Sequence, residues 1–184
     1  MRIIAGRFKG RKLAEFEGRD IRPTSDRARE SMFNLLMHGQ YAGEAVIGQH
    51  VVDLCCGTGA LGLEALSRGA ESVTFVDQDK KALGLARDNA IHCGISNTCH
   101  FLQGDVTRLP TASKQAALIL MDAPYDTPLL APAYASLKAQ GWLQSGTLIV
   151  NEMPSHATPP QLDGAELLDS RKYGKATIHI YRVN

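Results

Sequence analysis

Residues 51–62 decide the fold, and they read Val51-Val52-Asp53-Leu54-Cys55-Cys56-Gly57-Thr58-Gly59-Ala60-Leu61-Gly62. An apolar run reaches an acid, passes through glycines and enters a segment that can form a helix, which is how a buried strand delivers its carboxyl end to a ligand. Glycine tolerates backbone angles that other residues avoid, and it lets the main chain approach a ligand closely. The stretch therefore predicts a cofactor-binding loop after the first strand of an α/β domain.

Two cofactors suit this glycine pattern. The segment from Gly57 to Gly62 satisfies G-x-G-x-x-G, and Asp77 follows where a dinucleotide-binding protein carries a ribose-binding acid, which would make the protein an NAD-dependent oxidoreductase. Asp53 favours a different ligand, because an acid at the end of the strand repels a pyrophosphate but attracts a cation. S-adenosyl-L-methionine carries a sulfonium and an ammonium and has no phosphate, so we expect it to be the cofactor.

The composition limits the domain organisation and the compartment. With 184 residues and 44% hydrophobic content, the chain suits one globular domain with a full core and a small appendage. We expect the appendage at residues 1–40 and the main domain at residues 41–184. Apolar runs are too short to span a membrane and the N-terminus is charged, which indicates a cytoplasmic protein. The four cysteines have no C-x-x-C pairing, so we expect reduced thiols and no metal site.

Positive charge is concentrated at the N-terminus. Residues 1–30 contain nine Lys or Arg and five Asp or Glu, although the net charge of the whole chain is only +1. Residues 2–12 contain five cations and no acid, and they predict two short strands that turn at Lys9-Gly10-Arg11. This basic hairpin favours a negatively charged partner such as a nucleic acid, although a solvated edge hairpin is the alternative. The side chains expected to contact that partner are Arg2, Arg7, Lys9, Arg11, Lys12, Arg22 and Arg27.

A helix and an alternating pattern of strands and helices follow. Thr24 or Ser25 can cap a helix that begins near residue 26. Arg27 and Arg29 in its first turn are candidates to face substrate. Beyond it, the alternation predicts a mostly parallel, seven-stranded sheet that is covered on both faces and closed by an antiparallel C-terminal hairpin. The expected strands are residues 50–54, 72–76, 98–102, 116–121, 147–152, 166–173 and 176–183, and the expected helices are residues 60–68, 79–93 and 130–140.

Three predicted strands end in Asp53, Asp77 and Asp122, and Asp105 lies just beyond a fourth. Because parallel strands share a carboxyl edge, we expect these acids to line one crevice, where open α/β sheets bind ligands. Asp77 would accept the ribose hydroxyls, or else cap the helix that follows it. Asp105 would accept from the adenine amine while Val106 packs on the ring, unless Asp105 is an ordinary turn residue. The expected cofactor-binding residues are Asp53, Cys55, Gly57, Thr58, Gly59, Asp77, Gln78, Asp105, Val106 and Asp122.

The stretch Met121-Asp122-Ala123-Pro124-Tyr125 suits methyl transfer to an exocyclic amine. Acceptors should hold the amine hydrogens so that the nitrogen lone pair points at the methyl carbon, and the Asp122 carboxylate and the Ala123 carbonyl can do so. Pro124 keeps Ala123 extended and aims that carbonyl, while Tyr125 offers a face on which a base can stack after leaving a duplex or folded RNA. We therefore expect these four residues to form the catalytic site. The alternative is a turn at the strand end with a buried tyrosine.

Five stretches carry a resemblance to a known family: Arg2-Ile3-Ile4-Ala5-Gly6, residues 22–27, residues 53–62, residues 59–70, and Asp122-Ala123-Pro124-Tyr125, which resembles the DPPY/NPPY motif of methyltransferases that act on base amines. Together they look like the RsmD family, bacterial 16S ribosomal RNA (guanine-N2)-methyltransferases. The resemblance implies a Rossmann-like S-adenosyl-L-methionine-dependent methyltransferase fold with a small N-terminal basic hairpin and helix. It also implies that the substrate is the small ribosomal subunit rather than naked RNA. We expect the enzyme to be a monomer.

The chain departs from the family pattern at two places. Ala123 stands where the family usually has proline, and Cys55-Cys56 stands where Phe-Ala or a similar pair is usual. Ala123 keeps the carbonyl but loses a fixed φ, so we expect a less rigid acceptor but not a loss of activity. Besides the oxidoreductase, the other alternative is a non-catalytic RNA-binding protein that uses only the basic hairpin.

Overall fold

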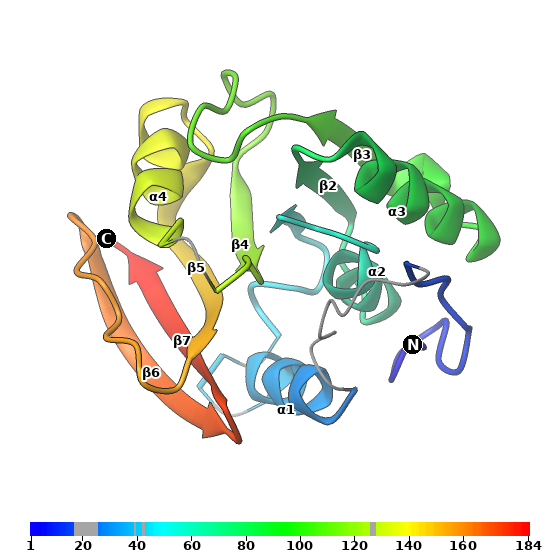
Figure 1. Ribbon diagram of the computed structural model, residues 1–184, viewed down its shortest axis with the longest axis horizontal. Coiled ribbons are helices and arrows are strands. Elements are labelled where there is room, and N and C mark those ends of the chain that lie inside the picture. The colour runs from blue at the N-terminus through cyan, green and yellow to red at the C-terminus, as the bar shows by residue number, and fades with distance from the viewer. Residues whose placement is uncertain (17–25, 39, 42, 126–127) are drawn as a thin grey trace.

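Seven strands form a single sheet in the order β3-β2-β1-β4-β5-β7-β6 (Figure 1). The computed structural model describes residues 1–16, 26–38, 40–41, 43–125 and 128–184. The strands are β1 (His50–Leu54), β2 (Ser72–Asp77), β3 (Cys99–Gln103), β4 (Ala116–Met121), β5 (Leu143–Pro154), β6 (Ala165–Tyr173) and β7 (Ala176–Val183). The helices are α1 (Asp26–Met37), α2 (Ala60–Ser67), α3 (Lys80–His92) and α4 (Leu130–Ala139), with a short 3₁₀ helix, η1 (Ser96–Thr98).

The strand directions confirm the predicted fold class. β1 pairs in parallel with β2 and β4, and β3 and β5 extend the parallel sheet on either side. β7 runs antiparallel between β5 and β6, so the C-terminal hairpin closes the sheet. The chain proceeds outward from β1 to β3 and then returns to the other side of β1 with β4. The carboxyl ends of β1 and β4 therefore border the place where open α/β sheets bind ligands.

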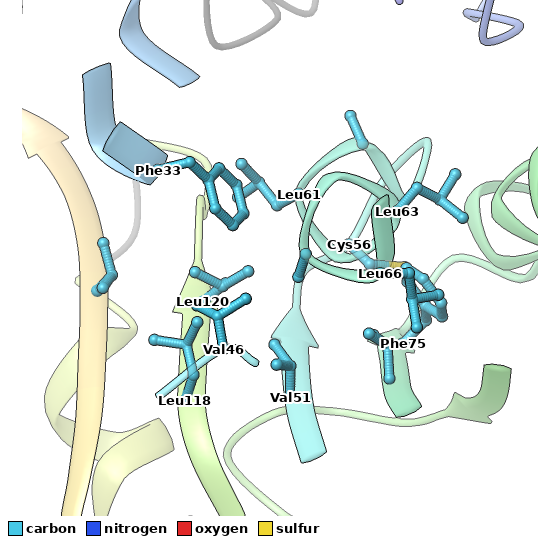
Figure 2. Close-up of a cluster of buried hydrophobic side chains, with 14 of the residues drawn as sticks. Phe33, Val46, Val51, Cys56, Leu61, Leu63, Leu66, Phe75, Leu118 and Leu120 are labelled. Carbon is cyan, nitrogen blue, oxygen red and sulfur yellow. The ribbon is translucent and has the colours of Figure 1, made fainter. Parts of the chain in front are cut away.

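Helices cover both faces of the sheet. On one face, α1, α2 and α3 share a core cluster with strand residues that include Val51 and Phe75, and Figure 2 shows Phe33 of α1 beside Leu61 of α2. On the other face, Leu137 of α4 belongs to the cluster that contains Val52. Val51 and Val52 point to opposite faces because side chains alternate along a strand. Every residue of β4 is buried, as expected for a central strand covered on both sides.

Two details differ from the sequence prediction. β5 begins at Leu143 rather than at the predicted residue 147. A bulge that contains Gly146, whose φ is 85°, interrupts the pairing of β5 with β4 between these two positions. A bulge breaks the periodicity from which strands are recognised. At the N-terminus, the expected pair of short strands is reduced to a single antiparallel bridge between Arg2 and Lys12.

Candidate active site

One row of residues crosses the sheet at the carboxyl ends of its strands. The register of β1 with β2 and with β4 puts Cys55 between Asp77 and Asp122. The neighbouring ladders extend the row to Gln103 on β3 and to Glu152 on β5. Adjacent strands lie about 4.8 Å apart. The predicted ribose acid and the predicted catalytic acid therefore lie two strands apart at the same edge.

Cys55 lies at the centre of this row, and the neighbouring carboxylates affect the pKa of its thiol. The pKa of its thiol is raised to about 12, first by burial and then by the carboxylates of Asp77, Asp53, Asp122 and Asp105. These carboxylates lie within electrostatic range of the thiol, as is expected of acids at or near neighbouring strand ends. The φ of Cys55 is 55°, and it is the one non-glycine residue with a positive φ in the described ranges. Backbone strain of this kind is concentrated at functional sites.

The glycines of the loop have different structural roles. Gly57 and Gly59 have φ values of 54° and 78°, which a side chain would strain. Gly59 is also the N-cap residue of α2. At Gly62, a Cβ would lie 2.4 Å from Cε1 of Phe75, so glycine is needed for close packing of α2 on β2. Two glycines that shape the turn and one that seats the helix are what a ligand-binding loop of this type requires.

Asp53 lies under this loop rather than in front of it. The residue is 1% exposed, and its Oδ2 accepts a 2.8 Å hydrogen bond from the N–H of Gly62. Burial raises the pKa of Asp53 well above its ordinary value, and the carboxylates of Asp122 and Asp77 also raise it. The expectation that Asp53 lines the crevice is therefore wrong. Residue 53 shares a face of β1 with Val51, so its side chain points at α2 and anchors the first turn of that helix.

Asp77 holds the loop from the neighbouring strand. Its Oδ2 accepts from the N–H of Gly57 at 3.0 Å, and its Oδ1 accepts from the N–H of Asp79 at 2.9 Å. The cap of α3 is Asp79, whose side chain accepts from the N–H of Lys81 at 2.8 Å. The alternative role of Asp77 as the helix cap is therefore wrong. Its half-buried carboxylate stays at the sheet edge beside the glycine loop.

The other predicted cofactor residues divide between the surface and the core. Gln78 and Asp105 are exposed, and Thr58 is half-buried. Asp105 forms a turn of its own, because its Oδ1 accepts from both the N–H and the hydroxyl of Thr107 at 2.8 Å, and these bonds lower the pKa of Asp105. Val106 is buried in the core cluster under α4, so its side chain packs inside the domain.

The predicted catalytic stretch lies at the end of β4. Asp122 and Ala123 are half-buried, whereas Pro124 is exposed. Tyr125 is 43% exposed, which contradicts the alternative of a buried tyrosine in a simple turn. The Tyr125 hydroxyl donates a 2.6 Å hydrogen bond to Oε1 of Glu152 on β5. The stretch thus presents an aromatic ring beside two neighbouring carboxyl groups.

Glu152 is a site residue that the sequence reasoning missed. It neighbours Asp122 in the row and fixes the hydroxyl of Tyr125. The signal that could have found it was already in use, since acids at the ends of other strands were selected as site candidates. Glu152 is the last residue of the predicted strand 147–152, so the same rule applied to that strand would have included it.

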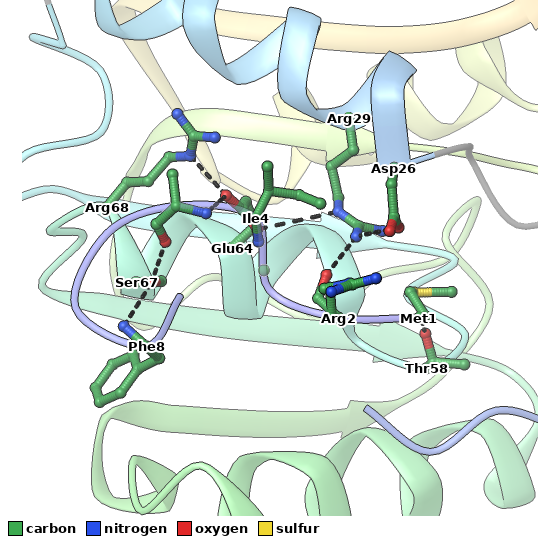
Figure 3. A network of polar contacts seen from close by, with 12 residues as sticks. Met1, Arg2, Ile4, Phe8, Asp26, Arg29, Thr58, Glu64, Ser67 and Arg68 are labelled. Carbon is green, nitrogen blue, oxygen red and sulfur yellow. Dashed lines mark hydrogen bonds and ion pairs between the residues drawn. The ribbon is translucent and has the colours of Figure 1, made fainter. Parts of the chain in front are cut away.

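The N-terminal segment, residues 1–16, is fastened to α2 by one carboxylate (Figure 3). Glu64 is fully buried and accepts from the N–H of Ile4 at 2.8 Å and from the N–H of Ala5 at 3.1 Å. Nε of Arg68 donates to Glu64 at 2.7 Å, and Nε of Arg29 lies 4.0 Å from its other oxygen. Glu64 therefore joins the N-terminal segment, α1 and α2.

Ser67 provides a second attachment of the N-terminal segment. The N–H of Phe8 donates to the Ser67 hydroxyl at 2.9 Å, and the N–H of Arg7 donates to the Ser67 carbonyl at 2.7 Å. A Cβ on Gly6 would lie 1.9 Å from that carbonyl oxygen, and the φ of Gly6 is 79°. The Gly at the end of the Arg2-Ile3-Ile4-Ala5-Gly6 motif is therefore required for this close approach to α2.

Asn89 of α3 links the N-terminal segment to the glycine loop. It is 2% exposed, and its Oδ1 accepts from the N–H of Ala14 at 2.8 Å. Its Nδ2 donates to the carbonyl of Ala14 at 3.2 Å and to the carbonyl of Thr58 at 2.9 Å. The segment and the loop consequently share one buried anchor.

Most of the predicted RNA-binding cations on the N-terminal segment face solvent. The exposed cations there are Arg2, Arg7, Lys9, Arg11 and Lys12. Arg11 also has contacts inside the protein, because it donates to the carbonyl of Cys93 and its guanidinium lies 5.0 Å from the ring centre of Phe8. Arg22 and the proposed cap residues Thr24 and Ser25 lie outside the described residues.

The two arginines in the first turn of α1 differ. Arg27 is exposed. Arg29 is 1% exposed, and its Nη2 donates to the carbonyl of Arg2 at 2.6 Å and to Asp26 at 2.9 Å. The expectation that Arg29 faces substrate is therefore wrong, because this side chain is part of the buried network around Glu64.

The described residues contain neither a membrane-spanning helix nor a metal-binding cluster. None of their helices is both long and apolar enough to cross a membrane. No cluster of three or more His, Cys, Asp or Glu side chains among them is arranged to hold a metal ion. All four cysteines are free thiols.

The chain is similar to known proteins along almost its whole length. A family model described as "Conserved hypothetical protein 95" matches residues 1–182. YlbH of Bacillus subtilis is 33% identical over 188 residues, which cover 99% of this chain and 98% of the relative. A Haemophilus influenzae protein named "Ribosomal RNA small subunit methyltransferase D" is 30% identical over 186 residues, which cover 99% of this chain and 93% of that protein. The solved structure of Escherichia coli yhhF has a TM-score of 0.83 at 27% identity, with 100% of this chain and 97% of that chain covered.

Proposed function

The chain belongs to the family described as "Conserved hypothetical protein 95", and we propose that it transfers a methyl group from S-adenosyl-L-methionine to 16S ribosomal RNA in the small ribosomal subunit. The resemblance to the RsmD family seen in the sequence is confirmed by the Haemophilus influenzae relative. The acceptor would be the N2 amine of one guanine. Residues 1–40 would form an RNA-facing appendage of the catalytic domain at residues 41–184, and the enzyme would act in the cytoplasm as a monomer.

The observation that carries this proposal is the row Asp77, Cys55, Asp122 and Glu152 at one edge of the sheet. The glycine loop, which Asp77 holds, lies at the same edge as the carboxyl groups of Asp122 and Glu152 and the exposed ring of Tyr125. Transfer between two substrates requires that both are held in reach and in line. An edge on which a cofactor site and an acceptor site are neighbours meets that requirement.

The residues on the β1 and β2 side fit S-adenosyl-L-methionine. The carboxylate of Asp77 suits ribose hydroxyls, and the loop around Gly57 lets the main chain approach a ligand. The gathered carboxylates that raise the pKa of Cys55 favour a ligand with a sulfonium and an ammonium. Asp53 would contribute by holding α2 rather than by touching the ligand. When bound, the cofactor supplies an electrophilic methyl group.

Asp122 and Ala123 would hold the amine that receives the methyl group. The carboxylate accepts one amine hydrogen and the Ala123 carbonyl accepts the other, which frees the lone pair and aims it. The methyl group would pass from the sulfur of the bound cofactor to the amine nitrogen held by these two acceptors, and Asp122 would pass the surplus proton to water. A strong base is not required, because the nitrogen becomes acidic only as it gains the methyl group. Ala123 keeps the carbonyl of the family's usual proline, so activity should be retained.

Tyr125 would hold the target base outside its helix. Removing a base from its stack costs about a few kcal/mol. Stacking on an aromatic ring contributes about 1–3 kcal/mol and offsets much of that cost. The 2.6 Å hydrogen bond from Tyr125 to Glu152 fixes one edge of the ring. The ring is therefore presented in a constant orientation.

The test is transfer of a labelled methyl group to small ribosomal subunits from bacteria that lack the corresponding gene, followed by nucleoside analysis. We expect the label in N2-methylguanosine and in no other nucleoside. Label in a different nucleoside would contradict the guanine assignment but not methylation of the RNA. Absence of label, together with tight binding of NADH and no binding of S-adenosyl-L-methionine in calorimetry, would contradict the whole proposal.

A further inference from the structure

A second basic cluster lies at the β6 end of the strand order, whereas the N-terminal segment lies over the β1–β3 half. We call it the hairpin tip and define it as residues 171–175, where β6 turns into β7. Lys172 and Lys175 are exposed. Among the described residues, Arg171 pairs with Asp169 at 2.9 Å, whereas the two lysines form no ion pair. The hairpin tip therefore presents two uncompensated positive charges to solvent.

Strand pairing places the hairpin tip at the catalytic edge. Arg171 pairs with Ile178 of β7, and Ile178 pairs with Glu152 of β5. Glu152 in turn binds the hydroxyl of Tyr125. Arg171 therefore continues the row that contains Asp122, and it lies two strands, or about 10 Å, beyond Glu152.

The turn itself projects beyond this row and is held in place. Lys175 precedes Ile178 by three residues, which is roughly 10 Å along a strand. The N–H of Ser155, just after β5, donates to the Lys175 carbonyl at 2.9 Å. Tyr173 is partly buried against the core cluster that includes α1. These contacts hold the backbone of the hairpin tip at a defined distance from the catalytic stretch.

The two basic regions flank the catalytic stretch. The N-terminal segment is attached to α2 and α3, which cover the β1–β3 half of the sheet. The hairpin tip belongs to β6 and β7 at the other side, and β4 lies between the two halves in the strand order. In Figure 1, α1 separates the turn between β6 and β7 from the N-terminal segment. An RNA strand that crosses the catalytic edge would thus meet cations on both sides of Tyr125.

Base flipping explains why cations are useful at these two places. When a base enters a pocket, its phosphates and those of its neighbours stay outside, near the rim. Contacts to phosphate fix the register of a strand without reading its sequence. Lysine serves this purpose well, because its compact ammonium on a flexible stem can follow a mobile backbone.

We propose that the hairpin tip binds the phosphate backbone of the RNA on the side of the target nucleotide opposite the N-terminal segment. This inference rests on the RNA substrate of the proposed function. It assigns to Lys172 and Lys175 a role in RNA binding that is separate from cofactor binding and from the chemical step.

The test compares lysine-to-glutamine variants with a matched control on the same hairpin. The double variant Lys172→Gln/Lys175→Gln removes both charges at the tip. Arg182→Gln is the control, because Arg182 is an exposed cation near the other end of β7, where it pairs with Leu148 and Glu166. Binding to unmethylated small subunits is measured over a series of salt concentrations, and Kd for S-adenosyl-L-methionine is measured by calorimetry.

The double variant should bind small subunits about tenfold more weakly or worse at low salt. The negative slope of log K against log salt should become shallower by about 0.7 for each lysine removed. Arg182→Gln should match the wild type, and the cofactor Kd and the kcat at saturating subunit should be unchanged in all variants. If the double variant keeps the wild-type slope and affinity while the wild type methylates the subunits, the role of the hairpin tip is refuted and the proposed function stands. If the wild type neither binds nor methylates them, the proposed function is refuted, and this inference with it.

Discussion

The cofactor half and the acceptor half of the catalytic edge are built differently. In the cofactor half, which consists of β1, β2 and residues 55–62, the loop is held by contacts from beneath and from both sides, through Asp53, Asp77 and Asn89. In the acceptor half, Pro124 and Tyr125 at the end of β4 are exposed, and Tyr125 reaches across to β5. Under the proposed function, the small cofactor would therefore meet a preformed site, whereas the acceptor side would stay open to a large partner.

The largest expected effect separates chemistry in the acceptor half from binding in the cofactor half. Asp122→Ala removes the carboxylate that holds the amine, so methyl transfer should fall by about 100-fold to 1,000-fold or more. Calorimetric binding of S-adenosyl-L-methionine should persist, because the glycine loop is held by other residues. Full activity in this variant would contradict the role assigned to Asp122.

The next effect concerns the support under the cofactor half. Glu64→Gln replaces a buried carboxylate, which faces two backbone N–H groups and two arginines, with an amide that also carries donors. The free energy of unfolding, measured in urea, should therefore fall by about 3 kcal/mol. Hydrogen exchange should rise in residues 1–16 more than in β6 and β7. Glu71→Gln is the matched control, since Glu71 pairs with Lys114 at the exposed surface and its loss should change stability very little. Equal effects of the two substitutions would show that the buried network does not support this half.

Asp77→Asn tests whether the cofactor half is shaped by its side contacts. The carboxylate accepts from two backbone N–H groups, and an amide can satisfy only one of them. One poorly paired donor costs about 1–3 kcal/mol, so Kd for S-adenosyl-L-methionine should rise about tenfold to a hundredfold, with little change in stability elsewhere. Asp79→Asn should leave Kd unaltered, because asparagine caps a helix as well as aspartate does. Unchanged binding in Asp77→Asn would remove Asp77 from the cofactor site.

The smallest effect is expected from the hydroxyl of Tyr125. Tyr125→Phe loses the hydrogen bond to Glu152 but keeps the ring, so KM for small subunits should rise about fivefold while kcat changes little. Tyr125→Ala also loses the stacking face, and its KM should rise further. If phenylalanine and alanine are equally defective in steady-state kinetics, the ring does not stack on the base and the acceptor half needs another account.

Strands with uniform burial could be predicted from sequence to the residue. β4 is six apolar residues that end just before Asp122, and β1 runs from His50 to Leu54 in front of the glycines, so their bounds follow from the local sequence. β5 was predicted too short, because the bulge at Gly146 interrupts its apolar pattern with exposed residues. The position of Asp77 and Asp122 at the same edge of the sheet was also predictable, since parallel strands share one carboxyl edge.

The polar contacts that support the site could not be predicted. Glu64 binds Ile4 from 60 positions away, and the sequence does not say which distant N–H groups an acid on an apolar helix will meet. Asp53 was placed wrongly although a signal existed. Asp53 shares its strand face with buried Val51, so the alternation of side chains along β1 already indicated that Asp53 points toward α2.

Asn89 connects the two regions to which the two substrates are assigned. A single buried amide carries both Ala14 of the basic N-terminal segment and Thr58 of the glycine loop. Under the proposed function, a shift of the segment on RNA binding would move the loop through Asn89. Thermodynamic reciprocity would then require that the methyl donor change the affinity for RNA by the same factor by which RNA changes the affinity for the donor. The binding of the two substrates would thus be coupled through one buried side chain.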